Sequence, residues 1–181
     1  VVRWVDAGVV DLRADQAAYE LGRQVEWLRD PEYVLTAEDL AADASARWQQ
    51  SSQLVPNLGY GNDAVWFRVG LHNVNVDTHW YLHINYPLIR DLDLFVVRDG
   101  VVSEVFQTGD RYEFSARPLD HRDFVFPLSI SKGSGITLLV RLSGPYSLQM
   151  PLILMSEQAM LQYEAKASLL HGLFFGFVLV M

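Results

Sequence analysis

The sequence predicts an all-β domain, a jelly-roll β-sandwich with one short internal helix. About eight segments alternate apolar and polar residues with a period of two, the pattern of strands that have one face in a core. Turn-forming residues separate these segments at short intervals. The strongest turn signal is Asp99-Gly100, which lies between LFVVR and VVSEVF and predicts a hairpin. This combination is typical of a sandwich.

The stretch from Asp63 to Asp99 predicts three successive strands around which the rest of the chain is organised. Polar connections, HNVNVDTH and NYPLIR, separate the three strands. The residues expected in the core are Val65, Phe67, Val69, Leu71, Trp80, Leu82, Ile84, Leu92, Leu94 and Val96. The alternate residues, expected together on one other face, are Trp66, Arg68, Tyr81, His83, Asn85, Asp91 and Asp93.

The residues before this stretch predict two extended segments and the helix. Residues 1–12 are expected to be extended, and residues 19–31 to form a strand that a bulge interrupts near Gly22. Thr36 and Asp39 resemble a capping box, and Leu40, Ala44 and Trp48 have the spacing of one helical face. These features predict a helix over residues 37–49, followed by a surface loop over 51–63.

The second half predicts a long loop, three more strands and a change of character after Ser156. Residues 107–122 form the loop, and strands are expected over 123–130, 136–142 and 148–154. Ser156 is expected to cap a helix that continues into the apolar residues 169–181. We interpret this tail as the start of a membrane span, although a core helix is the alternative. The expected division is a sandwich over 1–156 and a linker helix with the start of a span over 157–181.

The composition excludes several classes of function. The 181 residues include 14 basic and 22 acidic ones, a net charge of −8, whereas nucleic-acid binders cluster Lys and Arg against phosphates. The absence of cysteine excludes a disulfide scaffold, a zinc–thiolate site and a thiol nucleophile. Because half of the residues are apolar, the chain can bury the core of one domain.

No combination of residues indicates an enzyme, a cofactor or a metal site. His79 and His83 share a strand face, but no third ligand at a matching spacing accompanies them. Asp91 and Asp93 point in parallel from one strand, whereas a glycosidase needs two carboxyls that face each other across a cleft. We therefore expect no catalytic residue and no metal, and glycoside hydrolysis is the less favoured alternative.

Binding of a small polar ligand fits the residues better. An aromatic face stacks on a sugar ring, while imidazole and amide groups bond hydroxyls and guanidinium groups suit a carboxylate. The predicted ligand-binding residues are Trp66, Arg68, Tyr81, His83, Arg117, His121 and Arg122, the last three closing over the face from the long loop. The alternative for the first two is that Trp66 packs under a loop and Arg68 pairs with Asp91 or Asp93 across strands.

Three runs, VWFRVGLHN, NYPLIRDLDLFVV and RPLDHRDFVFPL, together with the apolar tail, carry a resemblance that covers about residues 10–181. The chain resembles the type-2 extracellular sensory module of bacterial seven-transmembrane receptors with diverse intracellular signalling modules (7TMR-DISM). The resemblance implies a fold like that of carbohydrate-binding modules, held in the periplasm and anchored to the inner membrane. It also implies that LLHGLFFGFVLVM begins the first of seven membrane helices.

The resemblance further implies cytoplasmic diguanylate cyclase, phosphodiesterase or histidine kinase domains as the output of the receptor. The partners expected for this chain are a sugar or small carboxylate, the membrane, and a second copy in a homodimer. A dimerisation or protein-interaction module without a small-molecule ligand is the alternative function.

Overall fold

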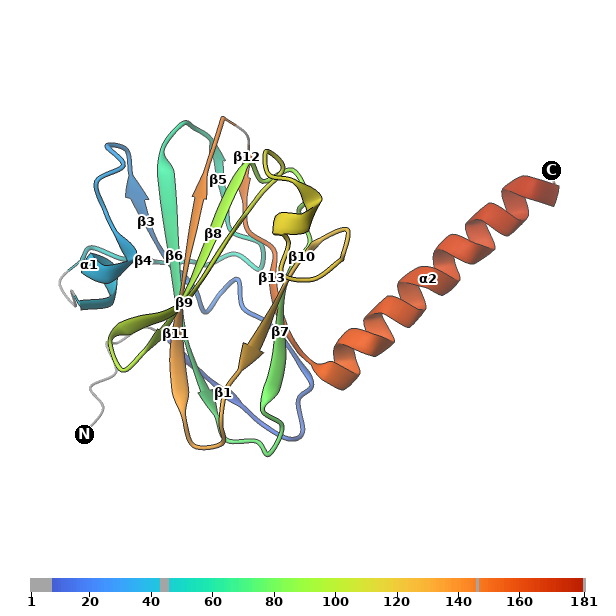
Figure 1. Ribbon diagram of the computed structural model, residues 1–181, viewed down its shortest axis with the longest axis horizontal. Helices are drawn as coiled ribbons and strands as arrows, with labels where there is room; N and C mark the ends of the chain where they lie inside the picture. Colours follow the sequence, from blue (N-terminus) through green and yellow to red (C-terminus); the bar gives the residue numbers. More distant parts are fainter. Residues whose placement is uncertain (1–7, 43–45, 146, 181) are drawn as a thin grey trace.

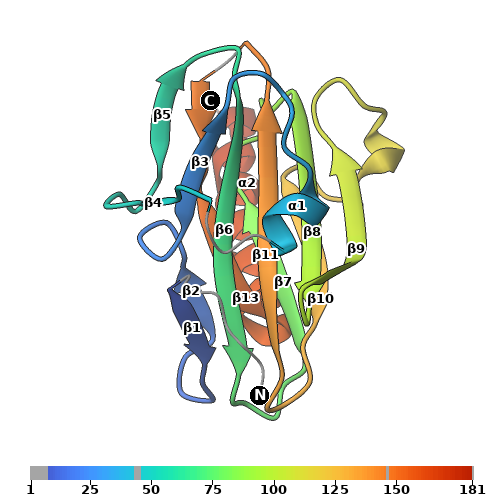
Figure 2. The same cartoon turned by 90° about the vertical axis from the view of Figure 1, so that its left-hand side faces the viewer.

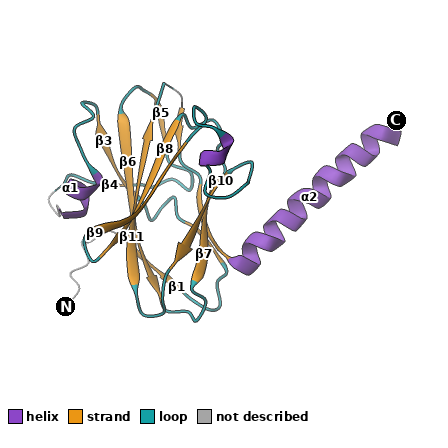
Figure 3. Cartoon of the chain, viewed as in Figure 1, coloured by secondary structure: helices purple, strands orange, loops and turns teal. Residues whose placement is uncertain are grey.

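A computed structural model describes residues 8–42, 46–145 and 147–180, and their side chains apart from those of residues 147 and 170–180. Two β-sheets face each other, and a long C-terminal helix extends away from them (Figure 1). Strands dominate the described chain, and the helices lie outside the two sheets (Figure 3). The predictions for residues 1–7, 43–45 and Met181 concern positions outside the described residues.

The larger sheet has the order β4-β3-β6-β11-β8-β9, and β1 pairs with β6 in parallel. Figure 2 shows these strands side by side, with α1 lying across them. Its seven strands are β1 (Val9–Leu12), β3 (Glu26–Asp30), β4 (Gln49–Gln50), β6 (Ala64–Asn73), β8 (Asp91–Arg98), β9 (Val101–Thr108) and β11 (Gly135–Ser143).

The smaller sheet has four strands in the order β10-β7-β13-β2. These are β2 (Ala18–Glu20), β7 (His79–Ile84), β10 (Phe124–Ser129) and β13 (Leu152–Ser156), and a separate pair joins β5 (Asn57–Tyr60) to β12 (Ser147–Gln149). The predicted single strand 148–154 is therefore two strands. Pro151 stands between them and offers no N–H to a ladder.

The main hydrophobic core lies between the two sheets. Every residue predicted for the core from the stretch 63–99 is at most 2% exposed. Along that stretch the chain alternates between sheets, because β6 and β8 belong to the larger sheet and β7 to the smaller one. The predicted all-β jelly-roll sandwich is confirmed.

The segment around Gly22 is a crossover between sheets, so the predicted bulge is wrong. β2 ends at Glu20 in the smaller sheet, and β3 begins at Glu26 in the larger sheet. A Cβ atom on Gly22 would lie 1.7 Å from the carbonyl oxygen of Leu54, so the backbones approach too closely for any side chain. Glycine interrupts the alternation here because the chain passes tightly against another loop.

The predicted N-cap at Thr36 and the predicted hairpin are both confirmed. The backbone N–H of Asp39 donates to Thr36 Oγ1 at the start of α1 (Ala37–Ala42). The helix is shorter than predicted, because β4 begins at Gln49 on the edge of the larger sheet. Asp99 and Gly100 have φ of 50° and 78° between β8 and β9, as a two-residue hairpin turn requires.

The C-terminal helix α2 (Glu157–Val180) begins where it was predicted to begin. Ser156 Oγ accepts a hydrogen bond from the N–H of Ala159 at 3.3 Å, as an N-cap does. Among the described residues, no helix combines the length and the hydropathy that crossing a bilayer requires. The membrane span over 169–181 stays a prediction, since the side chains of 170–180 and all of Met181 lie outside the described structure.

Apolar clusters also cover the outer faces of both sheets. On the larger sheet, α1 contributes Ala37 and Leu40 to a cluster with Trp66, Val97 and Leu139. On the smaller sheet, Met160 of α2 packs against Val125 and Met155. The sandwich therefore has little free polar sheet surface where α1 and α2 lie. The alternate strand positions that were expected on an open polar face are covered there by the helices.

Candidate functional site

The residues predicted to form one ligand-binding face lie on opposite sides of the molecule. Trp66 and Arg68 are on β6 in the larger sheet, whereas Tyr81 and His83 are on β7 in the smaller sheet. Alternation defines the two faces of one strand, but it does not tell which sheet the next strand joins. The prediction of a single shared face is wrong for this reason.

Trp66 and Arg68 are buried under α1 and the segment that follows it. Trp66 is 1% exposed, and its ring lies 5.6 Å from that of Phe95. Arg68 donates from Nε and Nη2 to the same carboxylate oxygen of Glu26, at 3.0 and 2.7 Å, and stacks on Trp48 at 4.4 Å. In this conformation both side chains stabilise the larger sheet, and neither is accessible to a ligand.

Arg68 does not pair with Asp91 or Asp93, because β11 lies between β6 and β8. Asp91 Oδ1 instead lies 2.6 Å from Arg111 Nε, and Asp93 Oδ2 lies 3.6 Å from Arg141 Nη1. Burial raises the pKa of the Asp93 carboxyl above its usual value, although the charge of Arg141 opposes this shift. The two carboxylates are therefore held in separate ion pairs.

The raised pKa of Asp93 predicts a specific dependence of stability on pH. The folded state holds this proton more tightly than the unfolded state, so stability is gained as the pH falls through the folded pKa and lost as it rises. We expect Asp93→Asn, which cannot ionise, to lose less stability than the wild type between pH 4 and pH 7. Each unit of displacement of the pKa corresponds to about 1.4 kcal/mol.

Urea unfolding at several pH values measures this difference. The matched control is Asp99→Asn in the exposed hairpin turn, which should follow the wild-type curve. Curves for Asp93→Asn and wild type that stay parallel over this range would contradict the assignment.

The remaining predicted residues gather at the base of α2, where five side chains form what we call the anchor cluster. It consists of His83, His121, Asp123, Tyr163 and Glu164. His83 Nε2 lies 2.9 Å from Asp123 Oδ2, and His121 Nε2 lies 2.9 Å from Glu164 Oε1. The ring of Tyr163 contacts that of His83 edge to face at 5.1 Å. The cluster thus joins the smaller sheet, the long loop and the helix.

Burial in this cluster lowers the pKa of its central histidine and so favours the neutral form. His83 is fully buried, and desolvation lowers the pKa of its imidazole below the usual value of 6.5, although its hydrogen bond to the Asp123 carboxylate opposes the shift. A neutral imidazole that donates to a buried carboxylate can hold the sheet and the loop in a fixed relative position.

Three other predicted residues surround the anchor cluster. Arg117 stacks on Phe114 and Phe124, at 4.9 and 4.6 Å, and its Nη1 donates to the carbonyl oxygens of His121 and Arg122. It therefore shapes the long loop, which includes the single turn η1 (Phe114–Ala116). Arg122 Nε lies 3.7 Å from Asp123, and Tyr81 is half-buried beside Met160. The ligand role predicted for these residues stays a prediction.

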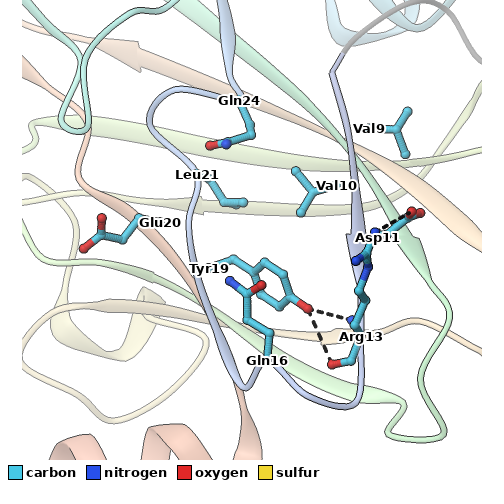
Figure 4. A pocket seen from close by; sticks show the side chains of 9 residues that line it. All are labelled: Val9, Val10, Asp11, Arg13, Gln16, Tyr19, Glu20, Leu21 and Gln24. Atoms are coloured by element: carbon cyan, nitrogen blue, oxygen red, sulfur yellow. Dashed lines mark hydrogen bonds and ion pairs between the residues drawn. The ribbon is translucent and has the colours of Figure 1, made fainter.

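A cavity of about 330 Å³ opens beside β1 and β2 (Figure 4). Its position is fixed by Tyr19, whose hydroxyl accepts a hydrogen bond from the N–H of Arg13 at 2.6 Å. The residues that line it are Val9, Val10, Asp11, Arg13, Gln16, Tyr19, Glu20, Leu21 and Gln24. Sequence reasoning missed this site because its residues come from two short strands and a turn, none of which carries a motif.

Comparison with known proteins gives one family and several distant solved structures. The model of the family 7TMR-DISM extracellular 2 matches residues 22–156. No curated protein matches the sequence. The solved structures named below share at most 14% identity with this chain, which spans less than two thirds of the length of each of them.

The first of these structures comprises the CUB1-EGF-CUB2 domains of rat MASP-1, at 12% identity and a TM-score of 0.32, covering 82% of this chain and 42% of that one. The insecticidal crystal protein Cry2Aa matches at 14% and 0.30, covering 59% and 19%. A carbohydrate-binding module of the β-sandwich superfamily matches at 8% and 0.30, covering 78% and 53%. At these scores the likeness supports no conclusion about a ligand.

The family match extends over well over half of the 181 residues and includes every strand of the two sheets except β1 and β2. Domains of this family are the extracellular parts of seven-transmembrane receptors and are not typically catalytic. The chain therefore belongs to the 7TMR-DISM extracellular 2 family, as a sensory domain on the outer side of a membrane-anchored receptor.

Proposed function

We propose that the domain senses a sugar or a small carboxylate in the periplasm and transmits its occupancy through α2 to cytoplasmic cyclase or kinase domains. In the full receptor, α2 would continue into the first membrane helix in the inner membrane. The single observation that carries the proposal is the direct hydrogen-bonded connection between the cavity beside β2 and the start of α2.

The cavity has the size and the chemistry for a small polar ligand. Its volume of about 330 Å³ lies at the lower end of the range for small-molecule sites. Carboxylate and amide groups in its lining can bond sugar hydroxyls, and the guanidinium of Arg13 can bind a carboxylate. Arg13 is largely exposed and lies 3.9 Å from Asp11, so this weak ion pair can open at little cost.

The wall of the cavity is paired directly with the strand that leads into α2. β2 pairs with β13 in the register Tyr19 to Leu154 and Ala18 to Met155. The N–H of Ser156 donates to the carbonyl oxygen of Ala17 at 2.8 Å, and α2 begins at the next residue. A ligand that moves residues 16–20 therefore moves the first turn of α2, provided that it binds the two positions with different affinity.

The test is a thermal-shift screen of sugars, sugar acids and dicarboxylates against the 181-residue chain in detergent. A binding compound at 100 times its Kd should stabilise the fold by about 2.7 kcal/mol. Arg13→Ala and Gln16→Ala should abolish the shift, whereas Arg98→Ala, an arginine of β8 that does not line the cavity, should retain it. No stabilising compound, or a shift that survives both cavity substitutions, would overturn the proposal.

A homodimer stays a prediction, as does the alternative of a pure dimerisation module. The screen and a measurement of molecular mass at several concentrations together separate the two functions, since a dimerisation module would show a mass that depends on concentration and no response to any compound.

A further inference from the structure

We propose that two histidines and two carboxylates of the anchor cluster bind one divalent transition-metal ion, which ties α2 to the smaller sheet. The ligands are His83 on β7, His121 in the long loop, Asp123 just before β10, and Glu164 on α2. This site lies apart from the cavity beside β2, so the proposal is independent of the ligand proposed there.

The positions of the ligand atoms suit a compact metal site. One ring nitrogen of each histidine and one carboxylate oxygen of Asp123 all lie within 4.8 Å of one another. The ligand atoms of tetrahedral Zn²⁺ are about 3.3 Å apart, given Zn–N bonds of about 2.0–2.1 Å. Rotations of the side chains that shorten the longest separation by about 1.5 Å therefore close the site.

The fourth ligand comes from the helix. Glu164 Oε1 already lies 2.9 Å from His121 Nε2, and its side chain is about one third exposed, so it can turn toward an ion. His121 Nδ1 accepts a hydrogen bond from the backbone N–H of Asp123 at 3.0 Å and lies 3.2 Å from the carbonyl oxygen of the same residue. Binding of a metal at Nε2 therefore moves the ring proton to Nδ1, which then donates to that carbonyl oxygen instead of accepting from the N–H. Histidine ligands of metals are usually held by such a second hydrogen bond.

The free protein leaves one feature of the cluster unexplained. His83 Nδ1 is buried and, among the described residues, has no hydrogen-bond partner. Buried polar atoms of this kind are uncommon in folded proteins, and a bound water or ion is a common partner for them. Since Nε2 of His83 pairs with Asp123, Nδ1 is the nitrogen that offers a lone pair to a metal, and the second buried group, Asp123, supplies a carboxylate oxygen.

The donor set selects the class of ion. Two imidazole nitrogens with two carboxylate oxygens suit Zn²⁺ and similar first-row ions. Ca²⁺ and Mg²⁺ prefer oxygen ligands throughout and larger coordination numbers, which this cluster does not offer. An ion of charge +2 would also balance the negative charges of Asp123 and Glu164. Arg122, whose Nε lies 3.7 Å from the Asp123 carboxylate, is the nearby positive charge that the ion would partly replace.

The test is isothermal titration of ZnCl₂ into the metal-stripped 181-residue chain in detergent, with Co²⁺ absorption as a measure of tetrahedral geometry. We expect one ion per chain, and weakening by at least about tenfold in both His121→Gln and Glu164→Gln. The matched control is His72→Gln, since His72 is also a histidine beside a carboxylate, 3.0 Å from Asp11, but outside the cluster. This control should bind as the wild type does.

Three outcomes would overturn the proposal. They are no saturable zinc binding by the wild type, wild-type affinity in His121→Gln or Glu164→Gln, and tighter binding of CaCl₂ than of ZnCl₂. Near-ultraviolet circular dichroism of each variant shows that it is folded, and both substituted side chains are partly exposed, so folding should persist.

Discussion

Trp66→Ala is expected to lower the free energy of unfolding by about 3–5 kcal/mol, because it leaves a cavity in a packed cluster. Trp66 is 1% exposed and packs with Leu40, Val97 and Leu139 beneath α1, with its ring against that of Phe95. A loss of this size is a large part of the stability of an ordinary domain. Chemical denaturation followed by circular dichroism measures it.

The matched control is Tyr60→Ala, an aromatic residue that is 83% exposed. Its free energy of unfolding should stay within about 0.5 kcal/mol of the wild-type value. If Trp66→Ala were equally neutral and instead removed binding of a sugar, Trp66 would be a ligand-stacking residue and the packing described above would be wrong.

Arg68→Ala should destabilise the fold by about 3–5 kcal/mol for a different reason, since it leaves the Glu26 carboxylate partly buried without its partner. The side chains of Arg68 and Glu26 are only 7% and 13% exposed, and one carboxylate oxygen accepts both hydrogen bonds. Loss of the stacking on Trp48 adds to the effect. The measurement is again denaturant unfolding at neutral pH.

Two comparisons isolate the contribution of the buried charge. Arg98→Ala breaks an ion pair whose side chains are 32% and 40% exposed, and should cost less than about 1 kcal/mol. The double variant Arg68→Met with Glu26→Leu removes both charges and should recover most of the lost stability. A double variant as unstable as Arg68→Ala would show that packing, not the unpaired carboxylate, causes the loss.

The sequence was sufficient to predict the features that local chemistry determines. The alternation of Val65, Phe67 and Val69 predicted a strand with a buried face, because the side-chain period of a strand is two. Thr36 and the pair Asp99-Gly100 predicted a helix start and a hairpin, because capping and positive φ depend on neighbouring residues only.

The candidate sites depend on contacts between distant residues, which no local pattern contains. His83 and Asp123 are 40 residues apart, and His121 and Glu164 are 43 apart, so neither pair has a recognisable spacing. The alternative that Arg68 pairs with Asp91 or Asp93 is wrong, because β11, which follows both β6 and β8 in the sequence, lies between them in the sheet. Burial of the second face of β6 likewise depends on α1, whose docking position the sequence does not reveal.

The central claim is that occupancy of the cavity beside β2 changes the position of α2. Because the chain has no cysteine, Leu161→Cys on α2 and Val105→Cys on β9 allow two spin labels to be attached at exposed positions. Pulsed electron paramagnetic resonance then measures the distance between the two labels, with and without the compound that stabilises the fold in the thermal-shift screen. A distance distribution that shifts with the compound, and does not shift in Arg13→Ala, is the result we predict. Saturated binding with an unchanged distribution would contradict the claim.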